Sequence, residues 1–128
     1  MGRTAKQATG DAGEEYAAQI LLAAGYEVIE RNFRVRTGEL DIIAWHTKVH
    51  FGRTLCFIEV KTRQAEDGSA ERATGYEKLR RLFRAAREYC LARGIDPERQ
   101  PIQFEQVSVR LGQDRQPAEC RQYVIPVE

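Results

Sequence analysis

Two stretches of the chain, residues 39–45 and 55–63, have apolar side chains at every second position over strand-like lengths. Because successive side chains of a β-strand point to opposite faces, each stretch has one largely apolar face. We expect the two to form an antiparallel hairpin. A one-residue slip would send its apolar side chains to the wrong face, so the pattern predicts Ile42 opposite Ile58. The matched faces hold Leu40, Ile42 and Ala44 on one strand and Cys56, Ile58 and Val60 on the other.

On the second face of the hairpin, this register brings charged side chains together. Asp41 falls opposite Glu59, and Glu39 falls opposite Lys61. Two carboxylates facing each other across a ladder repel, but a divalent cation between them would reverse the sign of the interaction. We therefore expect Asp41 and Glu59 to hold Mg²⁺ or Mn²⁺. Lys61, about 7 Å farther along the strand, is expected to orient or activate a water or to stabilise charge on a phosphate, and Arg63 to hold a neighbouring phosphate. The alternative is an ordinary solvated face.

Further elements are expected on both sides of the hairpin. Gly25 and Gly94 each follow a run with apolar residues at helical spacing and are predicted to end a helix. A flexible leader over 1–12 is expected before a single domain over 13–128. The expected elements are a helix over 13–24, a strand over 26–35, the hairpin with a loop over 46–53, a loop over 64–69, a helix over 70–93, and strands over 102–111 and 121–127. This α-β-β-β-α-β-β order predicts an α/β fold with a mixed sheet flanked by helices.

Glu14 lies at the head of the apolar stripe of the first expected helix. It precedes Ala17, Ala18 and Leu21 by three, four and seven residues, so it faces the sheet. An acid on the inner side of a helix needs a reason. One is the favourable field near a helix N-terminus. The other is a role as a third acid near the metal, binding it directly or through water.

Arginine is dense in the second expected helix. Arg80, Arg84 and Arg87 fall on one flank of its apolar stripe, where they could form a ridge for a phosphate backbone. The alternative is a solvated basic face. The formal net charge of +1 says little about partners by itself.

Composition excludes several classes of protein. No apolar run approaches the roughly 18 residues that a membrane-spanning helix needs, so no membrane contact is expected. The three cysteines are widely spaced and odd in number, which predicts reduced thiols in a cytoplasmic protein. His46 and His50 have a spacing seen in zinc sites, but no cysteine pair accompanies them.

Four ordered motifs resemble those of a known family. They are Gly13-Glu14, Arg31-Asn32-Phe33-Arg34, GELDIIA over 38–44 and FIEVKTR over 57–63. On these motifs the chain resembles the YraN-like family of bacterial proteins over residues 10 to 110. That family is similar to archaeal Holliday-junction resolvases and belongs to the restriction-endonuclease-like, PD-(D/E)xK, fold group.

The resemblance implies the roles of several residues. It implies a metal site made by Asp41 and Glu59, a catalytic lysine in Lys61 and a helix-borne acid in Glu14. Lys78 matches the family's basic start to the second helix and is expected to contact nucleic acid. Branched DNA as the substrate and a homodimer as the assembly are also implied by this likeness.

Two segments depart from the pattern of the family. Where the family has an RFD-like segment, this chain has Gln103-Phe104-Glu105, and no catalytic role is expected for Glu105. The hairpin loop is longer and adds His46, Lys48, His50 and Arg53. The first hypothesis is a metal-dependent nuclease that acts on DNA phosphodiesters. The alternatives are a nucleic-acid-binding module that does not cleave and, third, a protein-interaction scaffold.

Overall fold

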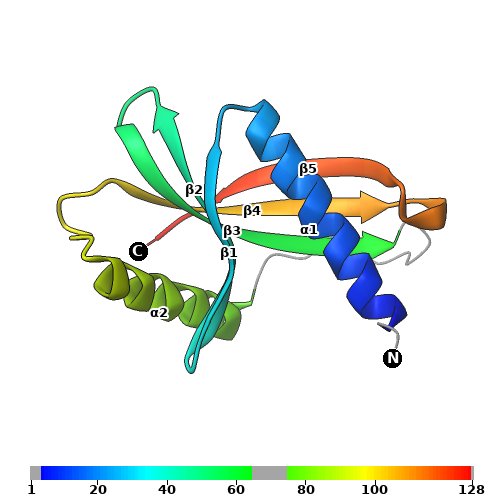
Figure 1. Ribbon diagram of the computed structural model, residues 1–128, viewed down its shortest axis with the longest axis horizontal. Coiled ribbons are helices and arrows are strands. Elements are labelled where there is room, and N and C mark those ends of the chain that lie inside the picture. The colour runs from blue at the N-terminus through cyan, green and yellow to red at the C-terminus, as the bar shows by residue number, and fades with distance from the viewer. Residues whose placement is uncertain (1–3, 65–74, 128) are drawn as a thin grey trace.

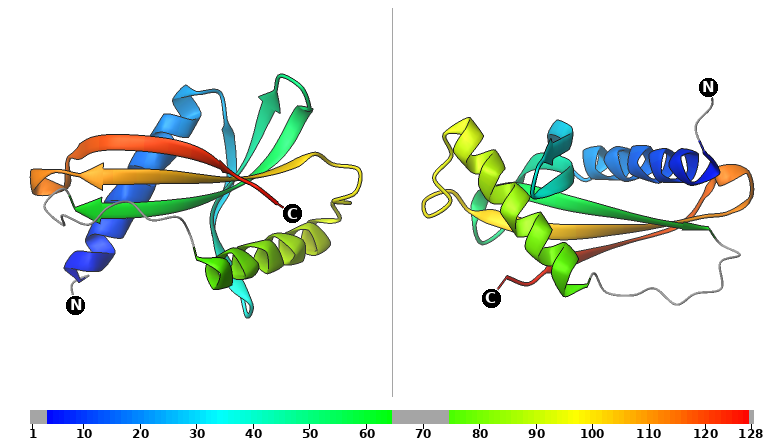
Figure 2. Two further views of the ribbon diagram at one scale, coloured as in Figure 1. Left: turned by 180° about the vertical axis from the view of Figure 1, so that it is seen from behind. Right: turned by 90° about the horizontal axis from the view of Figure 1, so that it is seen from below.

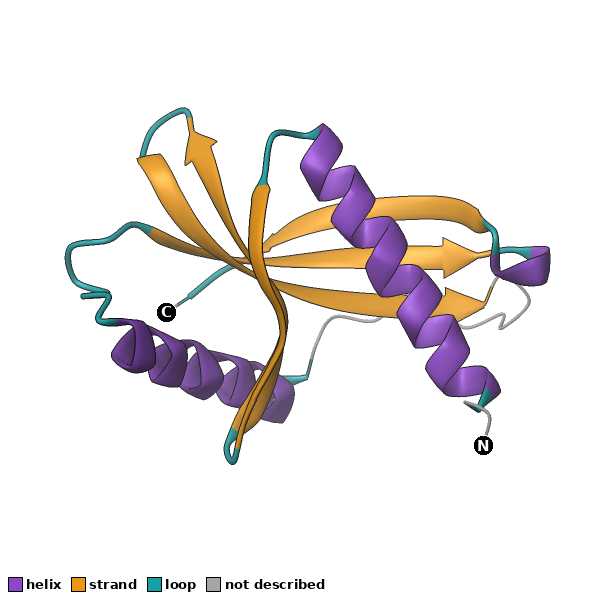
Figure 3. Ribbon diagram, in the orientation of Figure 1, coloured by secondary structure: helices purple, strands orange, loops and turns teal. Residues whose placement is uncertain are grey.

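Within residues 4–64 and 75–127, which the computed structural model describes, one sheet of five strands carries a helix on each face (Figures 1 and 3). Its elements are α1 (Ala5–Ala23), β1 (Glu27–Val35), β2 (Gly38–Lys48), β3 (Gly52–Gln64), α2 (Tyr76–Arg93), β4 (Ile102–Leu111), the 3-10 helix η2 (Gln113–Arg115) and β5 (Pro117–Ile125). The strands lie in the order β1-β2-β3-β4-β5. Neighbours are antiparallel except β3 and β4, which are parallel. The predicted element order and mixed sheet are confirmed.

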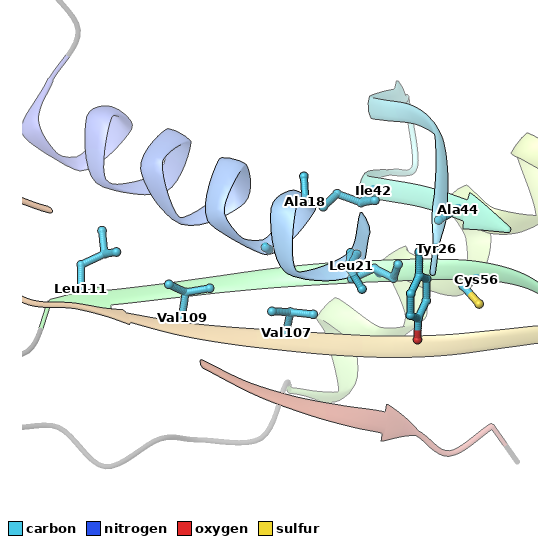
Figure 4. Close-up of a cluster of buried hydrophobic side chains, with 11 residues drawn as sticks. Ala18, Leu21, Tyr26, Ile42, Ala44, Cys56, Val107, Val109 and Leu111 are labelled. Carbon is cyan, nitrogen blue, oxygen red and sulfur yellow. The ribbon is translucent and has the colours of Figure 1, made fainter. Parts of the chain in front are cut away.

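Helix α1 covers one face of the sheet along β3, β4 and β5 (Figure 2, right). Beneath it, Val107, Val109 and Leu111 form a row along β4, and Leu21 packs over the same layer (Figure 4). Gly13 permits this close approach, because a Cβ there would come within 2.0 Å of the Thr62 hydroxyl. A glycine inside the helix is therefore required by packing.

Helix α2 covers the other face, mainly over β2 and β1. Its inner side chains meet an aromatic cluster in which Phe57 contacts both Tyr89 and Phe104. Gly94 ends the helix in the left-handed conformation, as predicted, with its N–H directed to the Cys90 and Leu91 carbonyls. The buried residues of α2 are Leu82, Ala85, Ala86, Tyr89 and Cys90.

Several predicted boundaries were wrong. Helix α1 begins at Ala5 instead of Gly13, so that Gly10 and Gly13 lie inside it. Strand β5 runs over Pro117–Ile125 instead of 121–127. The loop predicted over 46–53 is largely strand, since β2 extends to Lys48 and β3 begins at Gly52. The loop predicted over 64–69 and the start of the helix predicted at 70 fall mostly outside the described residues.

The predicted faces of β2 need one correction. Ile42 and Ala44 pack on the α1 side as expected, but Leu40 packs with Ile43 and Phe57 on the α2 side. Strict alternation therefore fails at Asp41, where the ladder with β3 also stops. In the described chain, no helix combines the length and apolar character needed to cross a membrane.

Candidate functional site

The predicted register between β2 and β3 is confirmed. Ile42 pairs with Ile58, and the ladder continues to Lys48 opposite Gly52. Asp41 and Glu59 are the next residues beyond its last pair. There, Asp41 Oδ2 accepts a hydrogen bond of 2.8 Å from the Val60 backbone N–H. The Asp41 side chain thus reaches across to β3, which fixes its carboxylate beside Glu59.

The carboxylate of Glu59 makes the ionisation of Asp41 more costly. Glu59 is only 6% exposed, and Asp41 is partly buried. Burial, followed by the negative charge of Glu59, raises the pKa of Asp41 to about 7, although the Val60 N–H works in the opposite direction. Glu14 and Glu39 add smaller negative contributions. These surroundings therefore favour the neutral form of Asp41.

Lys78 supplies a counter-charge on the other side of Glu59. Its Nζ lies 2.5 Å from Glu59 Oε1 and comes from the first turn of α2. Burial alone would lower the pKa of Lys78, but the hydrogen bond and charge of Glu59, and then the charge of Asp41, raise it. The sequence predicted Lys78 as a contact for nucleic acid. An ion pair with Glu59 was not foreseen, because nothing in the local pattern links residues from β3 and α2.

Glu14 approaches from the α1 side of the sheet. Its Oε1 accepts hydrogen bonds of 3.2 Å from Arg31 Nε and from Asn32 Nδ2. Asn32 has a φ of 56°, in the left-handed region that asparagine tolerates better than most residues. It lies between the pairs Arg31–Ile42 and Phe33–Leu40, hence across from Asp41. Sequence reasoning assigned Asn32 no role, although it stands in one of the quoted motifs.

The structure does not place Glu39 and Lys61 opposite each other as predicted. Lys61 is two residues beyond Glu59 on β3, is half-buried, and pairs in register with Ser108 of β4. The β2–β3 ladder does not extend far enough to place Glu39 opposite Lys61. Glu39 instead pairs with Arg34 on β1, at 3.4 Å. Beside Glu59 in the sheet lies Gln106, which is buried and donates to Ser108 Oγ.

A cleft of about 990 Å³ opens over Asp41 and Glu59. One wall is the β1–β2 turn, which contributes Arg34 and Arg36, and the other is the first half of α2. Gly38 allows these walls to meet, because a Cβ there would lie 2.5 Å from the Arg81 carbonyl oxygen. An acidic floor with cationic walls suits a phosphodiester whose charge is met from both sides.

Some of the predicted nucleic-acid contacts face this cleft. Lys78 and Arg84 line it, together with Arg81, which the sequence reasoning did not select. Arg80 lies over the Tyr76 ring at 5.8 Å and does not line the cleft. Arg87 and Arg63 are also absent from its lining, as are Glu14 and Lys61. Of the three arginines in the predicted ridge, Arg84 therefore lines the cleft and Arg80 and Arg87 do not.

The donor set fits Mg²⁺ or Mn²⁺ better than a metal that needs a complete protein cage. Among the residues that the structure describes, no three His, Cys, Asp or Glu side chains are grouped to hold a metal ion. Mg²⁺ is usually held by one or two carboxylates, with waters and phosphate oxygens completing its shell. The Asp41–Glu59 pair matches that pattern. His46, considered for zinc, stacks on Tyr26 at 3.8 Å.

Comparison with known proteins identifies relatives along most of the chain. The model of the uncharacterised protein family UPF0102 matches residues 13–111. A UPF0102 protein of Symbiobacterium thermophilum is 42% identical over 106 residues, covering 82% of this chain and 84% of its own length. Another, from Alkaliphilus metalliredigens, is 34% identical over 107 residues, covering 83% of this chain and 88% of its own. The matched range includes Glu14, Glu39, Asp41 and Glu59.

Proposed function

Since this chain belongs to the uncharacterised protein family UPF0102, the YraN family, and has an acid pair in a basic cleft, we propose that it is a metal-dependent nuclease acting on DNA. The observation that carries the proposal is the pair of neighbouring carboxylates Asp41 and Glu59, where burial and the negative charge of Glu59 raise the pKa of Asp41 to about 7. Such an arrangement is unfavourable for stability and is explained by a bound divalent ion.

In the proposed mechanism, Asp41 and Glu59 would hold Mg²⁺ or Mn²⁺, and the bound ion would supply polarisation of the scissile phosphate and a lowered pKa for the attacking water. The Val60 N–H keeps the Asp41 carboxylate directed at β3. Lys61, on the same face of β3 as Glu59, stabilises the charge that develops on the phosphate. Glu14 assists metal binding directly or through water. Hydrogen bonds from Arg31 and Asn32 fix its carboxylate on the α1 side of the sheet.

The cleft walls bind the backbone of the substrate in this proposal. Arg81 and Arg84 of α2 and Arg34 and Arg36 of the β1–β2 turn neutralise phosphates on either side of the acids. Contacts of this kind are independent of sequence and weaken with salt. We propose branched DNA as the preferred substrate and a homodimer as the working assembly, because two sites related by symmetry can cut two strands.

The test compares wild type with Asp41→Ala and Lys61→Ala on branched, nicked and linear DNA in Mg²⁺ or Mn²⁺. Wild type is expected to cut at least one of these substrates, and both variants to fall by about 10²-fold or more. Glu119→Ala is the control, since that glutamate pairs with Arg121 on β5, away from the cleft. Equal cutting by all four proteins would indicate a contaminating nuclease.

A nucleic-acid-binding module that does not cleave is the second candidate, favoured by the same basic walls. It would bind DNA with strong salt dependence and leave every substrate intact in both metals. Absence of DNA binding even at low salt would rule out both candidates and favour the interaction scaffold.

A further inference from the structure

Glu59 is neutralised by a residue outside the motif that contains it. Its side chain is 8% exposed, and a buried carboxylate is costly without a nearby cation. The Lys78 ammonium meets this need at 2.5 Å. Asp41, on the other side, increases the need because it carries the same sign of charge. An ammonium therefore lies against one of the two carboxylates expected to bind metal.

The two members of this ion pair differ in freedom. Glu59 belongs to a strand with neighbours on both sides, and its side chain is almost fully enclosed. The Lys78 side chain is 58% exposed and extends from the first turn of α2 on a flexible four-carbon stem. When a divalent cation arrives at Glu59, the lysine is the partner that moves.

The surroundings of Lys78 offer the displaced ammonium a second partner. It lines the same cleft as Arg81 and Arg84, where a phosphate backbone is proposed to lie. A phosphate there would pair with the Lys78 ammonium once it leaves Glu59. In the absence of DNA, no such exchange is available, and the lysine competes with the metal.

We propose that Lys78 is a built-in counter-ion that holds the cation position at Glu59 until metal and DNA bind together. The proposal rests on the function proposed above and adds its regulation. Because Lys78 binds either Glu59 or a phosphate, DNA strengthens metal binding and metal strengthens DNA binding by the same factor. Metal binding, and with it cutting, is thereby favoured in the DNA-bound protein.

The test measures Mn²⁺ affinity by calorimetry without DNA, on wild type, Lys78→Gln and Arg84→Gln. Both variants remove one positive charge from the same cleft wall, but only Lys78 contacts Glu59. We expect Lys78→Gln to bind Mn²⁺ about tenfold more tightly than wild type and Arg84→Gln to change it by less than about twofold. Lys78→Arg, which keeps the charge, is expected to bind close to wild type.

A second measurement adds a duplex with phosphorothioate linkages, so that cutting does not interfere. Saturating DNA should tighten Mn²⁺ binding about tenfold in wild type and in Arg84→Gln, but much less in Lys78→Gln. Thermal unfolding in each state provides a check on folding: without metal, Lys78→Gln should melt lower than wild type, and Mn²⁺ should raise its midpoint more.

Two results separate the failure of this proposal from failure of the nuclease site. If Asp41→Asn abolishes Mn²⁺ binding while Lys78→Gln and Arg84→Gln bind Mn²⁺ equally, the metal site stands and the counter-ion role is refuted. If no protein binds Mn²⁺, or Asp41→Asn binds it as wild type does, the proposed site is wrong and the role of Lys78 falls with it.

Discussion

Glu59 and Glu105 are both buried and lie on adjacent strands, yet they sit in opposite electrostatic situations. Glu105 faces the α1 side with Val107, whereas Glu59 faces the α2 side with Phe57. Burial alone would raise the pKa of Glu105, but hydrogen bonds from Tyr26, Lys48 and Gln103 hold it below its ordinary value. Gln122 also donates a hydrogen bond to this carboxylate. The side chains that contact it are therefore Tyr26, Lys48, Gln103 and Gln122.

The neighbours of Glu59 carry both signs of charge. It receives one ammonium, from Lys78, and has a second carboxylate, Asp41, as its neighbour. The network around Glu105 joins segments from the α1–β1 connection to β5 and has enough donors for its charge. At the site around Glu59, a second acid lies beside the first, and the pKa of that second acid is raised to about 7. The difference teaches that a buried acid surrounded by donors stabilises the fold, whereas two neighbouring buried acids point to a ligand.

Breaking the Glu105 network should have the largest effect on stability. Glu105→Ala leaves the Lys48 ammonium, 15% exposed, without its carboxylate, and should lower the free energy of unfolding by about 3–5 kcal/mol. Urea denaturation measures this loss. Glu119→Ala, at a solvent-exposed pair, should cost only about 0–1 kcal/mol. A loss below about 1 kcal/mol for Glu105→Ala would remove the distinction between the two clusters.

Neutralising Asp41 should raise the free energy of unfolding, whereas loss of Glu105 lowers it. Its raised pKa means that the folded state binds this proton more tightly than the unfolded state, so ionisation lowers stability as pH rises from the ordinary value of 3.8 to about 7. Asp41→Asn should therefore raise the free energy of unfolding by about 1–3 kcal/mol at pH 8 and abolish the stabilisation by Mn²⁺. The gain should vanish near pH 4.

This second experiment has a clear opposing result. If Asp41→Asn is less stable than wild type at alkaline pH, the Val60 hydrogen bond stabilises the folded state more than the repulsion from Glu59 destabilises it. The pair of acids would then not point to a bound cation. Melting curves over a range of pH, with and without Mn²⁺, provide both readouts.

Glu14 should give the smallest change in stability. Its pair with Arg31 is partly exposed, at 14% and 34% of the two side chains, so Glu14→Gln should change the free energy of unfolding by less than about 1 kcal/mol. Mn²⁺ affinity should fall less than in Asp41→Asn, because Glu14 acts from behind that residue. An equal loss in both variants, measured by calorimetry, would place Glu14 directly on the metal.

Much of the site could be predicted from pattern alone, because its parts are close in sequence or fixed by a period. The alternation of apolar side chains set Ile42 against Ile58, which brought Asp41 next to Glu59. The spacing of Ala17 and Leu21 placed Glu14 on the inner side of α1, where it reaches Asn32. These inferences needed only the repeat of a strand or a helix.

Other contacts could not be predicted because they join distant segments without a shared period. Tyr26 and Glu105 are 79 positions apart, and their hydrogen bond depends on how α1 delivers the chain to β1. The left-handed conformation of Asn32 occurs inside a segment that reads as a regular strand. Leu40 changed sides because β2 parts from β3 at Asp41, a local break that alternation does not contain.

The sequence by itself determined the order of the elements, the register of β2 against β3 and the pair of acids at the end of that ladder, because burial of apolar side chains favours one pairing of these two strands. Tertiary structure decided which cations contact the buried acids. Lys78 reaches Glu59 only once α2 has packed on the sheet, and Lys48 reaches Glu105 from a strand that is not its neighbour, since a charge acts through distance in space and leaves no periodic trace along the chain.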